Sequence, residues 1–240
     1  MPSSARRSNT PHLDRASRTI LRGASAFLLL AIGAACGGTA APDSAVGVRP
    51  AVAQQPGWSP ELEQTSARPL PPAGYGTLSQ DNITIGIQSG TLLIKLVPLD
   101  EWVIRLTAPD TYRRLNSFKV SRGEEILKRA ARAGERGWPR VFLVSFFTRN
   151  YEENYEPNDV QIRNQSFIYR PLAIIPITPD FTRERLRQQE TQMALYVYEE
   201  DVDLDLPLVA VYQNAEGPQW VGIRTSLDRE LATVLSRAAP

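Results

Sequence analysis

Residues 141–147 read Val-Phe-Leu-Val-Ser-Phe-Phe, a run with apolar side chains at both odd and even positions. The run is short and rich in β-branched and aromatic residues, which favours a strand over a helix. A strand that is apolar on both faces is typical of the centre of a sheet, where both faces are covered. The sequence therefore predicts that residues 141–147 form a central strand and the middle of the core.

Two half-buried strands are predicted before this segment. Residues 83–87 and 92–96 place isoleucine or leucine at every second position, and Ser89-Gly90 can turn the chain between them. After a break at residues 98–101, the apolar residues 102–106 are predicted as a third strand. Three short strands joined by tight turns indicate an antiparallel meander.

More short strands are expected in the second half of the chain, at residues 160–163, 167–169, 172–177, 193–198, 208–212 and 220–223. Pro171 and Pro176 remove backbone donors, so residues 172–177 are predicted to lie at a sheet edge or to contain a bulge. Many strands and few helices predict a mainly β, α+β fold. We expect an antiparallel β-sandwich-like domain with helices packed at one side.

Three helices are expected in this domain. The first covers residues 110–118, and the second follows a capping box at Ser121–Glu124. The second helix has a basic outer face that comprises Lys128, Arg129, Arg132 and Arg136. This face either meets an acidic partner or is a solvated surface with ion pairs. The third helix is predicted to be capped at residues 225–228 and to place Leu227, Leu231, Val234 and Leu235 on one face.

The composition excludes several kinds of chemistry. The 240 residues include one cysteine, Cys36, and one histidine, His12, both near the N-terminus. A domain downstream of them has no Ser-His-Asp triad, no Cys-His pair and no zinc-imidazole site. The 27 basic and 26 acidic residues nearly cancel, so nothing in the net charge favours nucleic-acid binding.

The N-terminal region has the pattern of an export signal. Residues 24–36 carry no charge, and five arginines but only one acidic residue precede them. Thirteen residues are too few to span a bilayer, which needs about 20. A basic segment, a short apolar segment and small residues before a break predict a secretory signal peptide.

Ile32-Gly33-Ala34-Ala35-Cys36 resembles the lipobox of bacterial lipoproteins, in which a cysteine is lipidated and becomes the mature N-terminus. This resemblance covers about the first 36 residues, and Gly33 stands where leucine is commoner. It implies an exported protein that is anchored in the lipid bilayer by an acylated Cys36. Gly37 follows in place of the Asp of an inner-membrane retention signal, which favours the outer membrane in a cell that has one.

The chain is thus divided into a signal peptide (1–35), a disordered Ala/Gly/Pro-rich tether (36–75) and one β-rich globular domain (76–240). Three other interpretations of the N-terminus stay open. An ordinary signal peptide cut near Ala40-Ala41 leaves a soluble secreted protein. The apolar run can also be an uncleaved anchor, or Arg6-Arg7 can belong to a twin-arginine signal.

Two acidic segments are candidate sites. The first contains Glu152, Glu153, Glu156 and Asp159, and the second contains Asp201, Asp203 and Asp205. Paired carboxylates can serve a glycosidase, and clustered carboxylates can bind calcium. Alternatively, the first segment is a solvated loop and the second is an edge segment that its charges protect from strand pairing. No cofactor is predicted apart from this candidate calcium ion.

Tyr196 and Tyr198 fall on the same face of a predicted strand. If that face is exposed, the two rings can stack on a sugar or on a protein partner. Packing in the core with the hydroxyls at its rim explains the same pattern.

The main functional hypothesis is a lipid-anchored cell-envelope protein whose β-rich domain is not catalytic. Such a domain binds or structurally supports a partner, either a protein or an envelope polymer, and not a nucleic acid. The alternative is a carboxylate-dependent hydrolase that acts on extracellular or cell-wall glycans with the two acidic segments. The hydrolase requires these two segments to converge on one pocket.

Overall fold

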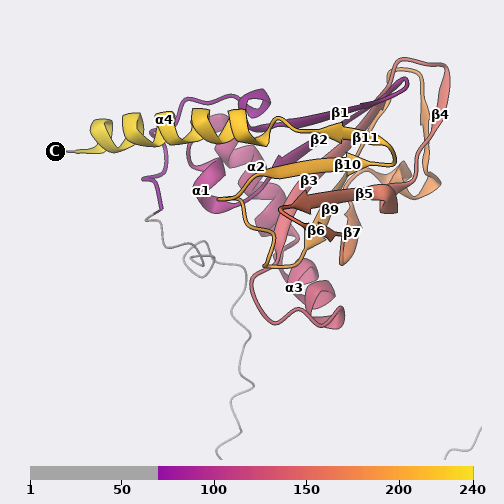
Figure 1. Cartoon of the computed structure of the whole chain (residues 1–240), viewed down its shortest axis with the longest axis horizontal. Helices are drawn as coiled ribbons and strands as arrows, with labels where there is room; N and C mark the ends of the chain where they lie inside the picture. The colour runs from indigo at the N-terminus through magenta and orange to yellow at the C-terminus, as the bar shows by residue number, and fades with distance from the viewer. Residues whose placement is uncertain (1–69, 240) are drawn as a thin grey trace, which may run out of the picture. The chain divides into compact units, whose positions relative to one another are not determined.

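Strand β3 (Arg140–Thr148) lies in the middle of a five-stranded antiparallel sheet in the computed structural model, which describes residues 70–239 (Figure 1). It pairs with β2 (Leu92–Pro98) on one side and with β9 (Thr191–Tyr198) on the other. Side chains on both faces of β3 are buried, among them Phe142 and Leu143. The prediction of a central strand at residues 141–147 is therefore confirmed.

The edges of this sheet also follow the sequence pattern. At one edge, β1 (Ile85–Ser89) forms a hairpin with β2, and Gly90 takes the positive φ of 57° that the tight turn requires. At the other edge lies β7 (Ala173–Pro176), whose one neighbouring strand among the described residues is β9. This is the edge position that Pro171 and Pro176 predicted. The strand order is β1-β2-β3-β9-β7.

A second antiparallel sheet packs on the first and has the order β11-β10-β5-β6. Its strands are β5 (Val160–Asn164), β6 (Phe167–Tyr169), β10 (Leu208–Tyr212) and β11 (Ala215–Gly217). Phe146 of β3 lies with its ring 6.2 Å from the ring of Tyr212 in the second sheet. A small separate sheet pairs β4 (Glu152–Asn154) with β8 (Arg185–Arg187). The predicted α+β fold with antiparallel sheets packed against each other is thus confirmed.

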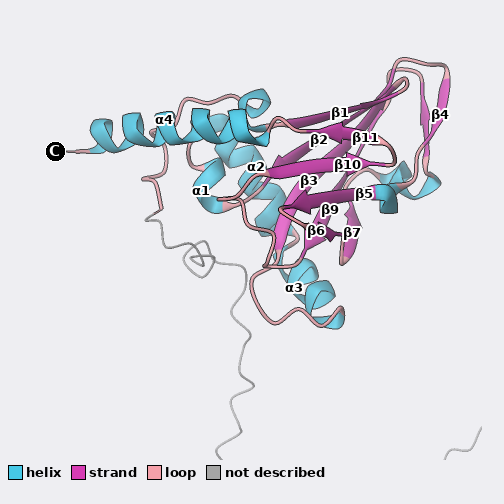
Figure 2. Cartoon of the chain, viewed as in Figure 1, coloured by secondary structure: helices cyan, strands magenta, loops and turns pink. Residues whose placement is uncertain are grey.

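Four α-helices accompany the sheets, as Figure 2 shows: α1 (Glu101–Ile104), α2 (Pro109–Ser121), α3 (Gly123–Arg132) and α4 (Trp220–Ala238). Three 3₁₀ helices cover Gln80–Ile83, Pro157–Asp159 and Pro179–Arg183. Helix α3 contacts β7 and β9 of the five-stranded sheet, and α4 contacts β10 of the other sheet. Among residues 70–239, no helix is both long enough and apolar enough to cross a bilayer.

The strand predicted at residues 102–106 is wrong, because this segment contains α1. Asp100 precedes the helix, and its side chain accepts a hydrogen bond from the backbone N–H of Trp102. Trp102, Val103 and Ile104 are all buried. A short run of buried apolar residues fits a helical turn as well as a strand, and the cap at Asp100 selects the helix.

Two predicted helix starts are also wrong. Ser121 is the last residue of α2, where its hydroxyl donates to the carbonyl of Phe118, and so it does not cap α3. Helix α4 begins at Trp220, in the segment predicted as a last strand, and not near residue 225. The hydroxyl of Thr225 donates to the carbonyl of Val221, one turn earlier in the same helix.

The two large sheets meet at one side, through β1 and β11. At the meeting side, β1 lies against β11, and a Cβ on Gly217 would come within 2.7 Å of the carbonyl oxygen of Gly86. The free ends of the two sheets are therefore β7 and β6, which only residues 170–172 separate in the chain. We call the region of β6, β7 and α3 the open side.

Candidate functional site

The first acidic segment is spread over β4 and the following 3₁₀ helix, and its carboxylates have different partners. Glu152 forms an ion pair with Arg185 of β8. Glu153 accepts a hydrogen bond from the hydroxyl of Thr91 at 2.5 Å. Asp159 accepts one from the amide of Gln213 at 3.3 Å, whereas Glu156 is exposed. These carboxylates do not share one centre.

The second acidic segment stabilises its own loop. The carboxylate of Asp203 accepts from the backbone N–H of Asp205 at 2.7 Å. Asp205 forms an ion pair with Arg224 of α4 at 3.1 Å, while Asp201 is exposed. Within residues 70–239, no group of three or more His, Cys, Asp or Glu side chains is arranged to hold a metal ion.

The structure does not bring the two acidic segments together. Glu152 and Glu153 lie on β4, which follows the end of β3 at Thr148, whereas residues 199–205 follow Tyr198, which pairs with Arg140 at the start of β3. A strand of nine residues spans roughly 25–30 Å. Asp159 precedes Val160, whose carbonyl accepts from Tyr198, and the length of β5, roughly 15 Å, separates it from Asn164, which contacts Asp203. Glycosidase carboxylates lie within about 10 Å of each other, so this arrangement argues against a hydrolase that uses both segments.

Tyr196 and Tyr198 lie in the interior and not on an exposed face. Both side chains are fully buried, and their hydroxyls donate to the carbonyls of Pro157 and Val160 in the direction of the second sheet. Burial raises the pKa of both phenols, so they stay neutral. The pair therefore corresponds to the alternative of core packing, because its face of β9 is the one that the second sheet covers.

The open side carries the apolar residues that the sequence did not single out. Phe167 and Ile168 of β6 are 64% and 63% exposed. The ring of Phe167 lies 6.4 Å from that of Tyr169 on the same face of the strand, and Ile168 points to the other face. Both exposed side chains lie on the strand that ends its sheet, with no further strand beside β6 within residues 70–239.

A groove of about 770 Å³ lies between α3 and the start of β7. Its lining consists of Glu124, Glu125, Lys128, Arg129, Arg132, Ala133, Leu172 and Ala173. Three members of the basic face that the sequence predicted thus line a concave surface. Its other wall, Leu172 and Ala173, is apolar.

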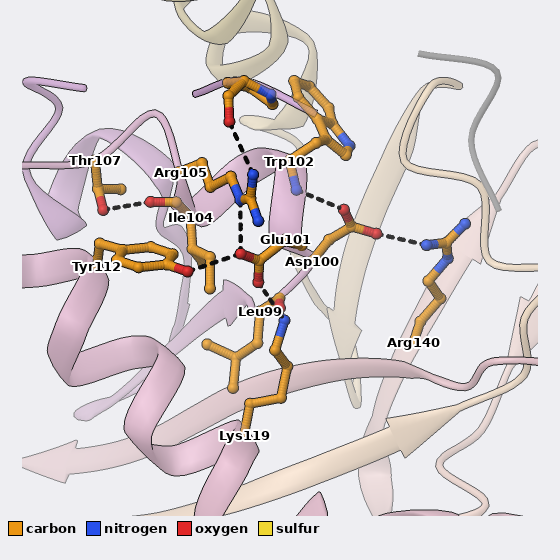
Figure 3. A network of polar contacts seen from close by, with 11 residues as sticks. Leu99, Asp100, Glu101, Trp102, Ile104, Arg105, Thr107, Tyr112, Lys119 and Arg140 are labelled. Carbon is orange, nitrogen blue, oxygen red and sulfur yellow. Dashed lines mark hydrogen bonds and ion pairs between the residues drawn. The ribbon is translucent and has the colours of Figure 1, made fainter. Parts of the chain in front are cut away.

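A buried ion network lies away from the open side, around Glu101 (Figure 3). The carboxylate of Glu101 is 2.9 Å from the ammonium of Lys119 and 2.7 Å from the guanidinium of Arg105, and it accepts from the hydroxyl of Tyr112 at 2.8 Å. Lys119 also donates to the carbonyl of Leu99 at 3.0 Å. The network thereby ties α1 to α2 and to the end of β2.

The electrostatics of the network keep Glu101 ionised. Burial alone would raise its pKa, but the charge of Lys119 and three donated hydrogen bonds lower the pKa below the ordinary value of 4.5. Burial and the bond to Glu101 raise the pKa of Tyr112 to about 12. Near pH 7 the carboxylate of Glu101 is therefore charged and the phenol of Tyr112 is neutral, and together with Lys119 they hold α1 against α2.

Acid is expected to remove the contribution of Glu101 to stability. Because its pKa is lower in the folded chain than in the unfolded chain, that contribution is present above the unfolded value near 4.5 and is lost as the pH falls through the folded value. The free energy of unfolding should therefore differ between the parent and Glu101→Gln by a constant amount near neutral pH. Urea titrations at a series of pH values should show this difference shrinking below about pH 4.5. A difference that stays constant to pH 3 would contradict this prediction.

The spacing of three residues in α2 could have indicated this network from the sequence. Thr111, Leu115 and Lys119 follow one another at intervals of four residues, so a helix places all three on one face. All three are buried. A lysine on the apolar face of a helix requires a buried acidic partner, which Glu101 provides.

Comparison with known protein families, with curated proteins and with solved structures found no match to this chain.

Proposed function

We propose that this chain is a lipid-anchored cell-envelope protein whose folded domain is a non-catalytic binding module. The anchor is supported by the lipobox-like residues 32–36 and by the basic and apolar segments before them. Cys36, the signal peptide and the tether lie outside the described residues 70–239, so this part of the proposal depends on the sequence.

The observation that supports binding is the exposure of Phe167 and Ile168 at the open side. At the other sheet ends, β1 lies against β11, and Arg129 of α3 donates to the carbonyl of Ile174 on the edge strand β7. An edge strand with exposed apolar side chains promotes association unless a partner covers it. A partner that covers β6 gives these two residues a role, which they lack in the isolated domain.

The anchor is tested by metabolic labelling with radioactive palmitate. The parent chain should incorporate label and fractionate with membranes, and Cys36→Ser should abolish incorporation because it removes the only thiol of the chain. Equal labelling of parent and variant would refute the anchor and leave the soluble secreted protein as the interpretation.

Binding is tested by photo-crosslinking in the native host. A benzophenone amino acid at position 168 should yield a discrete crosslinked species, because Ile168 is predicted to contact the partner. The same amino acid at Val221 of α4 is the control, since Val221 is 58% exposed but lies on another element. Equal crosslinking at both positions, or none at position 168, would contradict the assignment of the open side.

A further inference from the structure

We propose that the groove between α3 and β7 binds an extended, acidic polypeptide segment. This inference rests on the proposed function as a binding module and specifies the chemistry of the partner. The groove has one wall on α3, with three basic and two acidic side chains, and one apolar wall at Leu172 and Ala173.

The α3 wall has a net positive charge, because Lys128, Arg129 and Arg132 outnumber Glu124 and Glu125. The carboxylate of Glu125 forms ion pairs with the guanidinium groups of Arg129 at 2.7 Å and Arg122 at 3.3 Å. Lys128 and Arg132 are exposed, and neither forms an ion pair within residues 70–239. They stand four residues apart on the helix, where like charges are neighbours and repel each other. A carboxylate between them would relieve this repulsion.

The geometry of β7 favours an extended occupant. The backbone N–H of Ile177 donates to Met193 of β9, and Ala173 and Ile175 share its orientation because alternate residues of a strand face the same neighbour. The backbone of Ile174 therefore faces away from β9, and its carbonyl is 3.4 Å from the guanidinium of Arg129. On this side of β7 the carbonyl of Ile174 is bonded by Arg129, and Pro176 has no N–H. The backbone N–H of Ile174 is therefore the group that an extended chain in the groove can bond while it meets basic side chains on α3.

A peptide fits this surface better than an anionic bilayer. The groove is concave, and a flat bilayer surface would leave it empty. The open side also has negative charge at its far end, because Tyr169 lies near Asp201 and Glu199. Those carboxylates would repel an anionic bilayer, whereas a narrow segment beside α3 avoids them.

The test measures fluorescence anisotropy of a fluorescein-labelled ten-residue peptide of alternating Glu and Val, titrated with the full chain. Lys128→Glu combined with Arg132→Glu should raise Kd at least about tenfold, because like charges then face each other across the groove. The matched control is Arg113→Glu combined with Arg229→Glu, which changes the net charge equally at exposed positions of α2 and α4. The control should change Kd less than about twofold, since long-range effects of surface charge are screened by salt.

Three results would overturn the inference. They are an equal loss of affinity in both double variants, the absence of saturable binding by the parent, and selective binding of phosphatidylglycerol vesicles in place of the peptide through Lys128 and Arg132. The outcome is separable from the proposed function. Crosslinking at Ile168 without peptide binding would leave a binding module with a different partner, and lost palmitate labelling would leave the groove unaffected.

Discussion

Lys119→Met is expected to lower the free energy of unfolding by about 3–5 kcal/mol, because it leaves the buried carboxylate of Glu101 without its closest fully buried cation. Lys119 and Glu101 have side chains that are 0% and 1% exposed. Methionine keeps most of the apolar stem of lysine, so the effect reports the lost charge and the lost hydrogen bond to Leu99. Equilibrium unfolding in urea, followed by circular dichroism, measures the change.

Two comparisons isolate the buried ion pair. Lys95→Met removes the cation of an exposed pair with Asp81, whose side chains are 42% and 81% exposed, and should cost less than about 1 kcal/mol. Adding Glu101→Gln to Lys119→Met removes the buried charge that Lys119 no longer balances and that Arg105 still contacts, and should recover part of the loss. If Lys119→Met cost no more than Lys95→Met, the pair would not be buried as described.

The strands were predictable because their signals are local. The apolar run of β3 and the alternation of β1 and β2 depend on period and length alone, and the prolines around β7 placed it at an edge. Each of these strands can be recognised without knowing which segment lies beside it.

The missed helix α1 and the misplaced start of α4 were decided by a single cap and by a contact that is distant in the sequence. Trp220 begins α4 and is fully buried, and its indole N–H donates to the carbonyl of Leu204, sixteen residues earlier. Four apolar residues at 220–223 are too few to distinguish a strand from the first turn of a helix. At α1 the cap on Asp100 made the same decision.

The candidate site was predicted in part, for a related reason. The basic face of α3 follows from helical periodicity, but the groove exists because β7 lies opposite, which no local pattern reveals. Phe167 and Ile168 have the composition of core residues, and only the position of β6 at the end of its sheet exposes them. Likewise, the two acidic segments have similar sequences, although the length of β3 separates Glu152 and Glu153 from residues 199–205.

Phe146→Ala is expected to cost about 3–5 kcal/mol, because it opens a cavity where the two large sheets and the segment after β7 meet. Phe146 is fully buried, and its ring stacks on that of Tyr155 with centroids 4.3 Å apart. The rings of Phe181 and Tyr212 lie 6.0 and 6.2 Å away. Removing the ring therefore takes contacts from three separate segments, and urea unfolding should show the loss as a lower midpoint with little change in slope.

Phe147→Ala is the matched control, because the same substitution at the next residue of β3 changes the opposite face. Phe147 is only half-buried, so less apolar surface returns to water and the cost should stay below about 2 kcal/mol. The contrast tests the register of the central strand directly. Since side chains alternate, a shift of one residue in β3 would exchange the two faces and make Phe147→Ala the more damaging change. Equal costs at both positions would mean that neither face of β3 is more buried than the other, contrary to the packing of the second sheet on Phe146.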